Sequence, residues 1–330
     1  MTVAAVIPHW NRRDLLAALL ENLKGQTRVF DQIIVADNGS ADDSAEMAER
    51  AGAFVLRLGA NLGFAAAVNR GIEAANCHWV AILNNDVTLD PGWLGTLMDG
   101  AGREGIWFAG GKILSAMQPG VIDGSFDEVA RSGCPWRCGA GHPDSPIWDQ
   151  PRRIRMAPMT AALFRRDLFD RVGFLDEQFG PYGFEDVDFG IRCSLEGLKG
   201  IYIPGAMAYH RGSATLGRWN KETVRFLARN QMLLALKYLQ GQPPWPIVAG
   251  QVLWGCVALR HGCLLPYLRG RMEGRRLKAL EGRAQSKQTW APETVRVLLE
   301  ESERTIFDLQ QQTGFELYWR LYFWLSRRSS

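Results

Sequence analysis

Residues 3–40 read VAAVIPHWNRRDLLAALLENLKGQTRVFDQIIVADNGS, and this stretch decides the fold. Its apolar residues form short continuous runs at 3–7 and 33–36, and between these runs leucines recur at 15, 16, 19, 20 and 23. Short apolar runs indicate strands, and a recurrence every three or four residues indicates a helix. A strand, a helix and a second strand in this order are typical of a βαβ unit, so the stretch predicts an α/β fold.

The same alternation continues along the first 110 residues. We expect strands at 3–7, 32–36 and 55–58 and helices at 14–23 and 44–51, with Asn11 capping the first helix. Together they predict a mainly parallel sheet flanked by helices. In such a sheet the ligand crevice lies at the carboxyl ends of the strands. We also expect a strand at 79–83. Polar residues follow the predicted strands 3–7, 32–36 and 79–83, at 8–11, 37–40 and 84–86, and they define one candidate site.

Composition excludes several classes of protein. With 330 residues and 47% hydrophobic content the chain can bury a large core, and 38 basic against 35 acidic residues give no electrostatic reason to expect a nucleic-acid partner. Six scattered cysteines and the direct start on an apolar strand indicate a reducing, cytoplasmic setting. Cys134 and Cys138 lack a second pair, so we interpret them as loop cysteines and not as a zinc site.

Two later segments differ in composition from the first 110 residues. Residues 115–155 are rich in Gly, Pro, Ser and Asp with little periodicity, which predicts a long loop or lid. The prolines at 243, 244 and 246 break a helical pattern. We therefore expect a catalytic domain over residues 1–240 and a helical extension over residues 241–330.

The extension contains an apolar run at 247–268 that is interrupted by Arg260 and His261 and is followed by arginines and a lysine at 269, 271, 275, 276, 278 and 283. A central Arg-His pair and Pro266 argue against a simple membrane-spanning helix. We favour a peripheral contact with the inner membrane surface, since basic residues suit an anionic leaflet. The alternative is a helical hairpin packed on the catalytic domain. The aromatic residues at 315–324 are expected to be interfacial anchors, core or an oligomer seam.

Six short segments stand in a fixed order along roughly residues 1–235: 6–11 (VIPHWN), 35–40 (VADNGS), 61–64 (NLGF) with Asn69, 84–86 (NND), 183–188 (GFEDVD) and 209–213 (YHRGS). In this order they resemble the inverting glycosyltransferases of family 2, especially the rhamnosyltransferase-like members. The resemblance implies the GT-A fold, which is Rossmann-like, and a nucleotide-sugar donor. It implies that the nucleotide is bound by Pro8, Trp10, Asn11, Asp37, Asn61, Gly63, Asn69, Asn84 and Asn85.

Asp37 ends a predicted strand and opens an Asp-Asn-Gly-Ser turn. Its carboxylate can accept a hydrogen bond from a pyrimidine N–H, and the resemblance gives this position the role of reading the base. The alternative is that Asp37 caps the helix after Gly39, because N-caps and Asx turns use the same residue types.

Asp86 follows an apolar strand and offers a hard oxygen ligand for Mg²⁺ or Mn²⁺. Such an ion neutralises the charge that develops on a departing nucleoside diphosphate. The resemblance makes His210 a second ligand. Asn84 departs from the Asp-x-Asp form of the family motif. The metal site therefore has one formal negative charge fewer, and Asn84 is expected to contact the ribose or a water.

Glu185 and Asp186 are adjacent acids between an aromatic and glycine-rich loop and a predicted helix. Capping of that helix alone would explain them. They also suit a general base beside an acceptor pocket, and we assign Asp186 as the base and Glu185 as the neighbour that positions it or the acceptor. Asp188 is expected to cap the helix or to pair with Arg192.

The predicted function is inverting transfer of a sugar from a nucleoside diphosphate to a saccharide hydroxyl, in cell-surface polysaccharide synthesis. The resemblance suggests a dTDP-rhamnose-like donor or a UDP-hexose. The resemblance and the C-terminal extension together suggest that the acceptor is a polyprenyl-diphosphate-linked saccharide or another surface-polymer precursor. Two other classes stay open. A dinucleotide-binding oxidoreductase would share the strand and helix order, but such enzymes carry a G-x-G-x-x-G turn after the first strand and this chain does not. A catalytically silent sugar-binding scaffold would share the fold.

Overall fold

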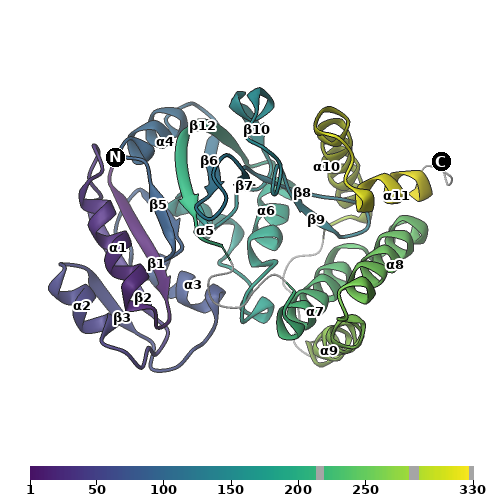
Figure 1. Cartoon of the computed structure of the whole chain (residues 1–330), viewed down its shortest axis with the longest axis horizontal. Coiled ribbons are helices and arrows are strands. Elements are labelled where there is room, and N and C mark those ends of the chain that lie inside the picture. Colours follow the sequence, from purple (N-terminus) through teal and green to yellow (C-terminus); the bar gives the residue numbers. More distant parts are fainter. Residues whose placement is uncertain (213–218, 282–289, 327–330) are drawn as a thin grey trace. The chain divides into compact units, whose positions relative to one another are not determined.

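The computed structural model of the chain describes residues 1–212, 219–281 and 290–326. The chain forms two compact units, one of Met1–Asp127 with Gly139–Ala214 and one of Glu128–Cys138 with Thr215–Ser330. The predicted domain boundary at residue 240 lies inside the second unit and not at its edge. The elements of both units are labelled in Figure 1.

Within the described residues the first unit has one ten-stranded sheet in the order β10-β12-β6-β11-β4-β1-β2-β3, with β5 paired to β12 and β7 to β6. The strands are β1 (Val3–His9), β2 (Gln32–Asp37), β3 (Phe54–Arg57), β4 (Trp79–Leu83), β5 (Val87–Leu89), β6 (Ile106–Ser115), β7 (Ile122–Gly124), β10 (Arg152–Ile154), β11 (Ala161–Arg165) and β12 (Lys199–His210).

The sheet is parallel only in part. β1 to β4 pair in parallel, as the sequence predicts. Beyond β4 the sheet is mixed, because β11 runs antiparallel to both of its neighbours, β4 and β6. β12 is one continuous strand, and its pairing with β6 shifts between Ile203 and Met207. This irregularity lets β12 continue to His210.

Helices accompany the strands of the first unit, and Figure 1 shows α1 and α2 beside β1 to β3. They are α1 (Arg13–Lys24), α2 (Ser44–Arg50), α3 (Phe64–Ala74), α4 (Trp93–Ala101), α5 (Arg166–Val172) and α6 (Glu185–Leu195), with 3-10 turns η1 (Pro146–Asp149) and η2 (Glu177–Phe179). The predicted side-chain cap of α1 is wrong. Arg12 is its N-cap residue and makes no capping bond, whereas Asn11 Oδ1 accepts from the backbone N–H of Ala41 at 2.9 Å.

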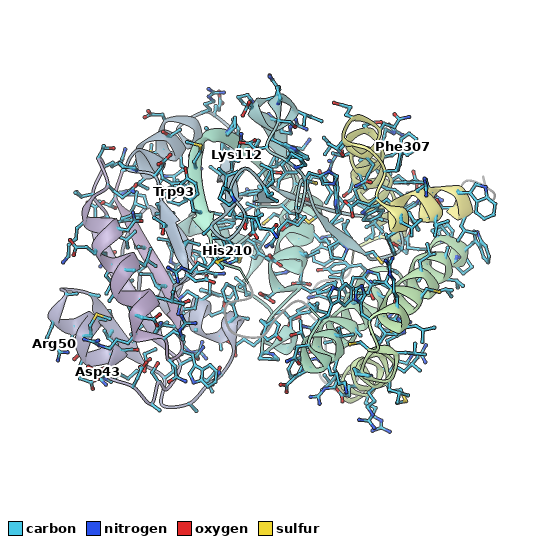
Figure 2. All side chains as sticks on the ribbon, in the orientation of Figure 1. Asp43, Arg50, Trp93, Lys112, His210 and Phe307 are labelled. Atoms are coloured by element: carbon cyan, nitrogen blue, oxygen red, sulfur yellow. The ribbon has the colours of Figure 1, made fainter. Side chains whose placement is uncertain are left out.

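The segment expected to be a loop or lid is held in place by a buried lysine. Lys112 of β6 is only 3% exposed, and its Nζ lies 2.8 Å from Asp144 and 2.5 Å from Asp149 (Figure 2). Burial lowers the pKa of Lys112, but the hydrogen bonds with both aspartates outweigh burial and raise it. A buried charge must be paired, so Lys112 fixes residues 144–149 to the sheet.

The second unit consists of helices and a short hairpin: α7 (Lys221–Tyr238), α8 (Pro244–Arg260), α9 (Leu264–Glu281), α10 (Pro292–Thr313), α11 (Leu317–Ser326), β8 (Asp127–Val129) and β9 (Pro135–Arg137). Figure 1 shows α7, α8 and α9 side by side. A Cβ added at Gly270 would lie 2.0 Å from the Arg225 carbonyl oxygen, and one at Gly274 would lie 2.6 Å from that of Arg229. Glycines let α9 approach α7 closely, which places α7 with the C-terminal helices.

Polar contacts join the hairpin to the helices of the second unit. Arg131 Nη2 lies 2.7 Å from Glu303, and the Ser302 hydroxyl accepts from the Val129 N–H at 2.7 Å. Cys134 and Cys138 lie directly before and after β9, in loop positions as expected, and both are fully buried. Among the C-terminal aromatic residues Trp319, Tyr322 and Phe323 are buried and form core, Phe315 and Tyr318 are partly buried, and Trp324 is exposed.

The apolar run at 247–268 is divided between α8 and α9, which are separated at 261–263 and pack against each other. In the part of the chain that the structure describes, every helix is too short or too polar to cross a membrane. Among the basic residues after the run, Arg283 and the side chain of Lys278 lie outside the described residues.

His9, at the end of β1, is a buried titratable group. Its side chain is 2% exposed; Nδ1 lies 2.9 Å from Asn85 Nδ2, and Nε2 has no hydrogen-bond partner among the described residues. Burial lowers the pKa of His9 from 6.5 to about 4, although Asp37, Asp42 and Asp14 oppose the shift. The imidazole is therefore neutral in the folded protein at neutral pH.

Acid should consequently destabilise the fold through His9. Above pH 6.5 His9 is neutral in both states; as pH falls from 6.5 towards 4 only the unfolded chain takes up the proton, so about 3 kcal/mol of stability is lost. Urea unfolding at pH 7 and pH 4 should show that His9→Asn, which keeps an acceptor for Asn85, loses less stability than the wild type. The exposed His78 supplies the control His78→Asn, which leaves His9 in place. Equal pH dependence in wild type and His9→Asn would contradict this account.

Candidate active site

The carboxyl ends of three neighbouring parallel strands meet at one edge of the first unit's sheet. β1 lies between β2 and β4, and His9 is paired in register with Asp37. The bond between His9 and Asn85 connects the end of β1 to the residues that follow β4. Asn84 leaves β4 with its N–H bonded to the Thr160 carbonyl at 2.9 Å. The three polar segments predicted from the sequence therefore come together.

Asp37 lies at the end of β2 and is buried. Its carboxylate accepts from the backbone N–H of Ser40 at 3.2 Å and from the Ser40 hydroxyl, which in turn accepts from the Asn11 N–H at 2.8 Å. α2 begins only at Ser44, with Asp43 at its N-cap, so Asp37 does not cap that helix. The turn positions Asp37 at the sheet edge. Pro8 is half-buried in β1, and Trp10 beside it is 45% exposed.

The Asn61–Gly63 turn lies against the Asp37 turn and against the loop before α6. Asn38 Nδ2 donates to the Gly63 carbonyl at 3.1 Å, and the Leu62 N–H donates to Asn38 Oδ1 at 3.2 Å. Gly63 has φ +92°, and a Cβ there would lie 3.1 Å from Pro181 backbone atoms. Asn61 Oδ1 accepts from the Gly63 N–H at 3.1 Å, so this amide orders its own turn.

Asn69 has a structural role. It is buried in α3, where its Nδ2 donates to the Leu175 carbonyl at 2.9 Å and to Glu177 Oε1 at 3.0 Å. Its Oδ1 accepts from the Leu175 N–H at 3.0 Å. The amide nitrogen and the amide oxygen of the Asn69 side chain thus both hold residues 175–177 on α3. We therefore leave Asn69 out of the nucleotide site proposed below.

Asp86 and His210, the two predicted metal ligands, are in contact. His210 ends β12, and its Nε2 lies 3.1 Å from Asp86 Oδ1 (Figure 2). Its Nδ1 lies 2.8 Å from Asp123 Oδ2. Burial lowers the pKa of His210, but hydrogen bonds with Asp123 and Asp86 outweigh burial and raise it to about 9. The final serine of the YHRGS segment, Ser213, lies outside the described residues.

The Asp86 and His210 side chains fit a divalent cation. Two ligand atoms at about 2.1 Å from one octahedral ion lie about 3 Å apart, close to the 3.1 Å observed between Asp86 Oδ1 and His210 Nε2. Carboxylate oxygen and imidazole nitrogen are both ligands of Mn²⁺-type ions. Among the described residues no three His, Cys, Asp or Glu side chains could hold a metal ion together. The pair would therefore share the ion with diphosphate and water.

Glu185 and Asp186 begin α6, directly after the loop that contacts Gly63. The Phe64 N–H donates to the Pro181 carbonyl at 2.8 Å, which holds this loop against α3. Glu185 is buried, whereas Asp186 is partly exposed and its Oδ1 accepts from the Val187 N–H at 2.9 Å. Asp188 is fully buried and lies 3.0 Å from Arg192 Nε, so the predicted pairing is confirmed.

Asp123 is the polar residue at this site that no sequence pattern indicated. It lies in β7, inside the segment expected to be an unstructured loop. Strand pairing brings Asp123 to His210, since β7 pairs with β6 and β6 pairs with β12. Residues without local periodicity gave no signal for such pairing, and only the observation of a histidine in need of an orienting carboxylate would have prompted a search for it.

Comparison with known proteins identifies relatives of the chain. The family model "Glycosyl transferase family 2" matches residues 4–173, more than half of the chain. An N-acetylglucosaminyl-diphospho-decaprenol L-rhamnosyltransferase of Mycobacterium tuberculosis is 29% identical over 283 residues, which cover 76% of this chain and 89% of that protein. A chondroitin synthase of Escherichia coli is 27% identical over 274 residues, covering 74% of this chain and 38% of that protein.

Solved structures share the fold. The crystal structure of GalNAc-T7 with UDP, GalNAc and Mn²⁺ has a TM-score of 0.60 at 13% identity, and covers 87% of this chain and 58% of that chain. The mannosyltransferase PcManGT from Pyrobaculum calidifontis, in complex with GDP-Man and Mn²⁺, has a TM-score of 0.53 at 16% identity, covering 97% and 85%. With the GT-A fold predicted from the sequence and the extent of the family match, the chain belongs to glycosyl transferase family 2 and is a glycosyltransferase.

Proposed function

We propose that the chain moves a sugar from a nucleoside-diphosphate sugar to a hydroxyl of a saccharide acceptor, with inversion at the anomeric carbon, in the synthesis of a cell-surface polysaccharide. The contact between Asp86 and His210 at the carboxyl edge of the sheet carries this proposal. It supplies two ligands for Mg²⁺ or Mn²⁺ where a diphosphate would lie in an open α/β sheet. The rhamnosyltransferase relative favours a dTDP-rhamnose-like donor, with a UDP-hexose as the second candidate.

The nucleotide is held by the residues after β1, β2 and β4. The Asp37 carboxylate accepts the N–H of a pyrimidine, and Asn84 and Asn85 offer amides to the ribose or to water. Pro8, Trp10 and Asn11 line the end of β1, while Asn61 and Gly63 shape the adjoining turn. When bound, the cation neutralises the negative charge that develops on the leaving diphosphate. Asp86 and His210 hold it in place.

Asp186 serves as the general base. It accepts the proton of the acceptor hydroxyl while that oxygen attacks the anomeric carbon from the face opposite the nucleotide, so the bond to the diphosphate breaks as the new bond forms and the configuration inverts. The hydrogen bond from the Val187 N–H orients the Asp186 carboxylate. Glu185, buried beside it, positions the base or the acceptor.

Asp186→Asn tests the assignment of the general base. The variant should fold and bind nucleotide, yet transfer should fall by roughly 2 to 4 orders of magnitude because the proton acceptor is lost. Turnover is measured on the donor that a hydrolysis screen over nucleotide sugars identifies. Asp167→Asn removes an exposed acid from the first turn of α5 and should behave as wild type. Near-normal turnover of Asp186→Asn would reassign the base.

The metal proposal predicts coupled binding of cation and nucleotide. Asp86→Ala should weaken Mn²⁺-dependent binding of UDP or dTDP most, and His210→Ala to a smaller degree, because each removes one of two protein ligands. Calorimetric titration with and without Mn²⁺ measures this dependence, and Asp99→Asn on the exposed surface of α4 is the control. If both site variants bind the nucleotide as the wild type does under both conditions, the metal site is wrong.

We also propose that the second unit holds the enzyme at the inner, anionic surface of the cytoplasmic membrane, where it meets a lipid-linked acceptor. The name of the rhamnosyltransferase relative specifies a diphospho-decaprenol acceptor. After its first residue, Pro244, the exposed residues of α8 are Trp245, Val248, Val252, Cys256, Leu259 and Arg260, which form an apolar stripe that ends in one charge. On α9 the exposed Leu265, Leu268 and Met272 are accompanied by Arg269, Arg275 and Arg276.

Charge supports a lipid surface over association of two copies of the chain. α8 contains no acidic residue, and the one acid of α9 whose side chain is described, Glu273, lies 3.4 Å from Arg225. An arginine-bearing face repels its own copy but is attracted to anionic lipid, with about 1 kcal/mol for each basic residue near the surface. Oligomerisation through the exposed residues of α8 and α9 is the alternative to membrane binding.

Co-sedimentation of the full chain with vesicles tests the membrane contact. The wild type should bind anionic vesicles at low salt, bind neutral ones less, and be released by high salt, because the arginines act through screened charge. Substituting Val248, Val252 and Leu259 by serine, or Arg269, Arg275 and Arg276 by glutamate, should abolish binding. Val297→Ser on the exposed surface of α10 is the control. Absence of wild-type sedimentation would leave the second unit as a packing or oligomerisation element.

A further inference from the structure

A carboxylate from outside the sequence motifs contacts the side of His210 that faces away from Asp86. Asp123 Oδ2 lies 2.8 Å from His210 Nδ1, and Asp86 Oδ1 lies 3.1 Å from His210 Nε2. The His210 side chain is 13% exposed and that of Asp123 is 26% exposed. One imidazole is thus held between two carboxylates, one at each ring nitrogen.

Backbone pairing fixes the three side chains relative to one another. Asp86 immediately precedes β5, whose Val87 is paired with His210 of β12. The Arg211 N–H donates to the Asp86 carbonyl at 3.1 Å, and the Ala116 N–H donates to the His210 carbonyl at 2.8 Å. β12 pairs with β6 and β6 pairs with β7, which carries Asp123. The arrangement is therefore part of the sheet and not of a separate loop.

Gly212 lies beside the contact between Asp123 and His210, and its backbone conformation favours glycine. It has φ +57°, a left-handed conformation that favours glycine. A Cβ at this position would lie 3.4 Å from Asp123 Oδ1 and 3.6 Å from His210 Nδ1. The chain thus turns away after His210 without a side chain beside the Asp123–His210 pair.

We propose that Asp123 is a positioning residue for the metal site: it accepts the hydrogen bond of His210 Nδ1–H and so directs the Nε2 lone pair towards the ion shared with Asp86. This inference rests on the metal site of the proposed function. A carboxylate on the second ring nitrogen fixes both the tautomer and the orientation of a ligating histidine, and its loss typically costs about 10- to 100-fold in metal affinity. Asp123 itself does not touch the ion.

Titration of Mn²⁺ on the full chain tests this role, with free Mn²⁺ followed by electron paramagnetic resonance, alone and with UDP or dTDP. Asp123→Ala should weaken Mn²⁺ binding by about 10-fold or more, whereas Asp123→Asn, whose carbonyl can still accept from Nδ1–H, should recover much of the affinity. Asp149→Ala is the matched control, because it removes a carboxylate that anchors the same segment through Lys112. It should bind Mn²⁺ as the wild type does.

A spectroscopic measurement separates positioning from general loosening. The ¹⁴N coupling of bound Mn²⁺ in electron spin echo spectra should be present in wild type, absent in His210→Ala, and lost or altered in Asp123→Ala at saturating Mn²⁺. Unchanged affinity and coupling in Asp123→Ala, or equal weakening in Asp149→Ala, overturns the inference and leaves the metal site intact. Equal Mn²⁺ binding by wild type and His210→Ala removes the metal site itself and the role of Asp123 with it.

Discussion

The parallel pairing of β1 with β2 and β4 is the constraint on which the candidate site depends. It places the carboxyl ends of three strands at one edge, so that Asp37, His9 and the residues after Leu83 become neighbours although they are distant in the sequence. Direct hydrogen bonds connect the residues after β4 to the neighbouring strand ends. His9 bonds to Asn85, and the backbone of Asp86 bonds to that of Arg211 beside His210.

Burial explains why the edge can be both polar and ordered. The Asp37 carboxylate is satisfied by Ser40, and the His210 ring is held between Asp86 and Asp123. Such groups are expensive to bury without partners, so each fixes the geometry of its neighbours. Lys112 does the same for residues 144–149, which it holds on the sheet of the first unit.

Local patterns predicted the elements of residues 3–58, because periodicity and turn chemistry are properties of neighbouring residues. The resemblance to the family, and not local periodicity, brought Asp86 and His210 into one metal-site hypothesis before any distance was known. Local patterns could not predict long-range pairing. Three features depend on contacts across more than 50 positions: β11 lies antiparallel beside β4, Asp123 contacts His210, and Asn69 holds residues 175–177. The grouping of α7 with α9 likewise depends on glycines whose role emerges only when two helices touch.

The central claim is that one sheet edge binds the nucleotide through Asp37 and the cation through Asp86 and His210. A crystal structure of the chain with Mn²⁺ and UDP or dTDP tests it most directly. The account predicts that the pyrimidine lies at Asp37 and that Asp86 Oδ and His210 Nε2 ligate the ion together with the diphosphate. It also predicts that the face of the donor sugar opposite the nucleotide lies beside Asp186. A nucleotide bound away from the carboxyl ends of β1, β2 and β4, or an ion that neither Asp86 nor His210 ligates, would contradict it.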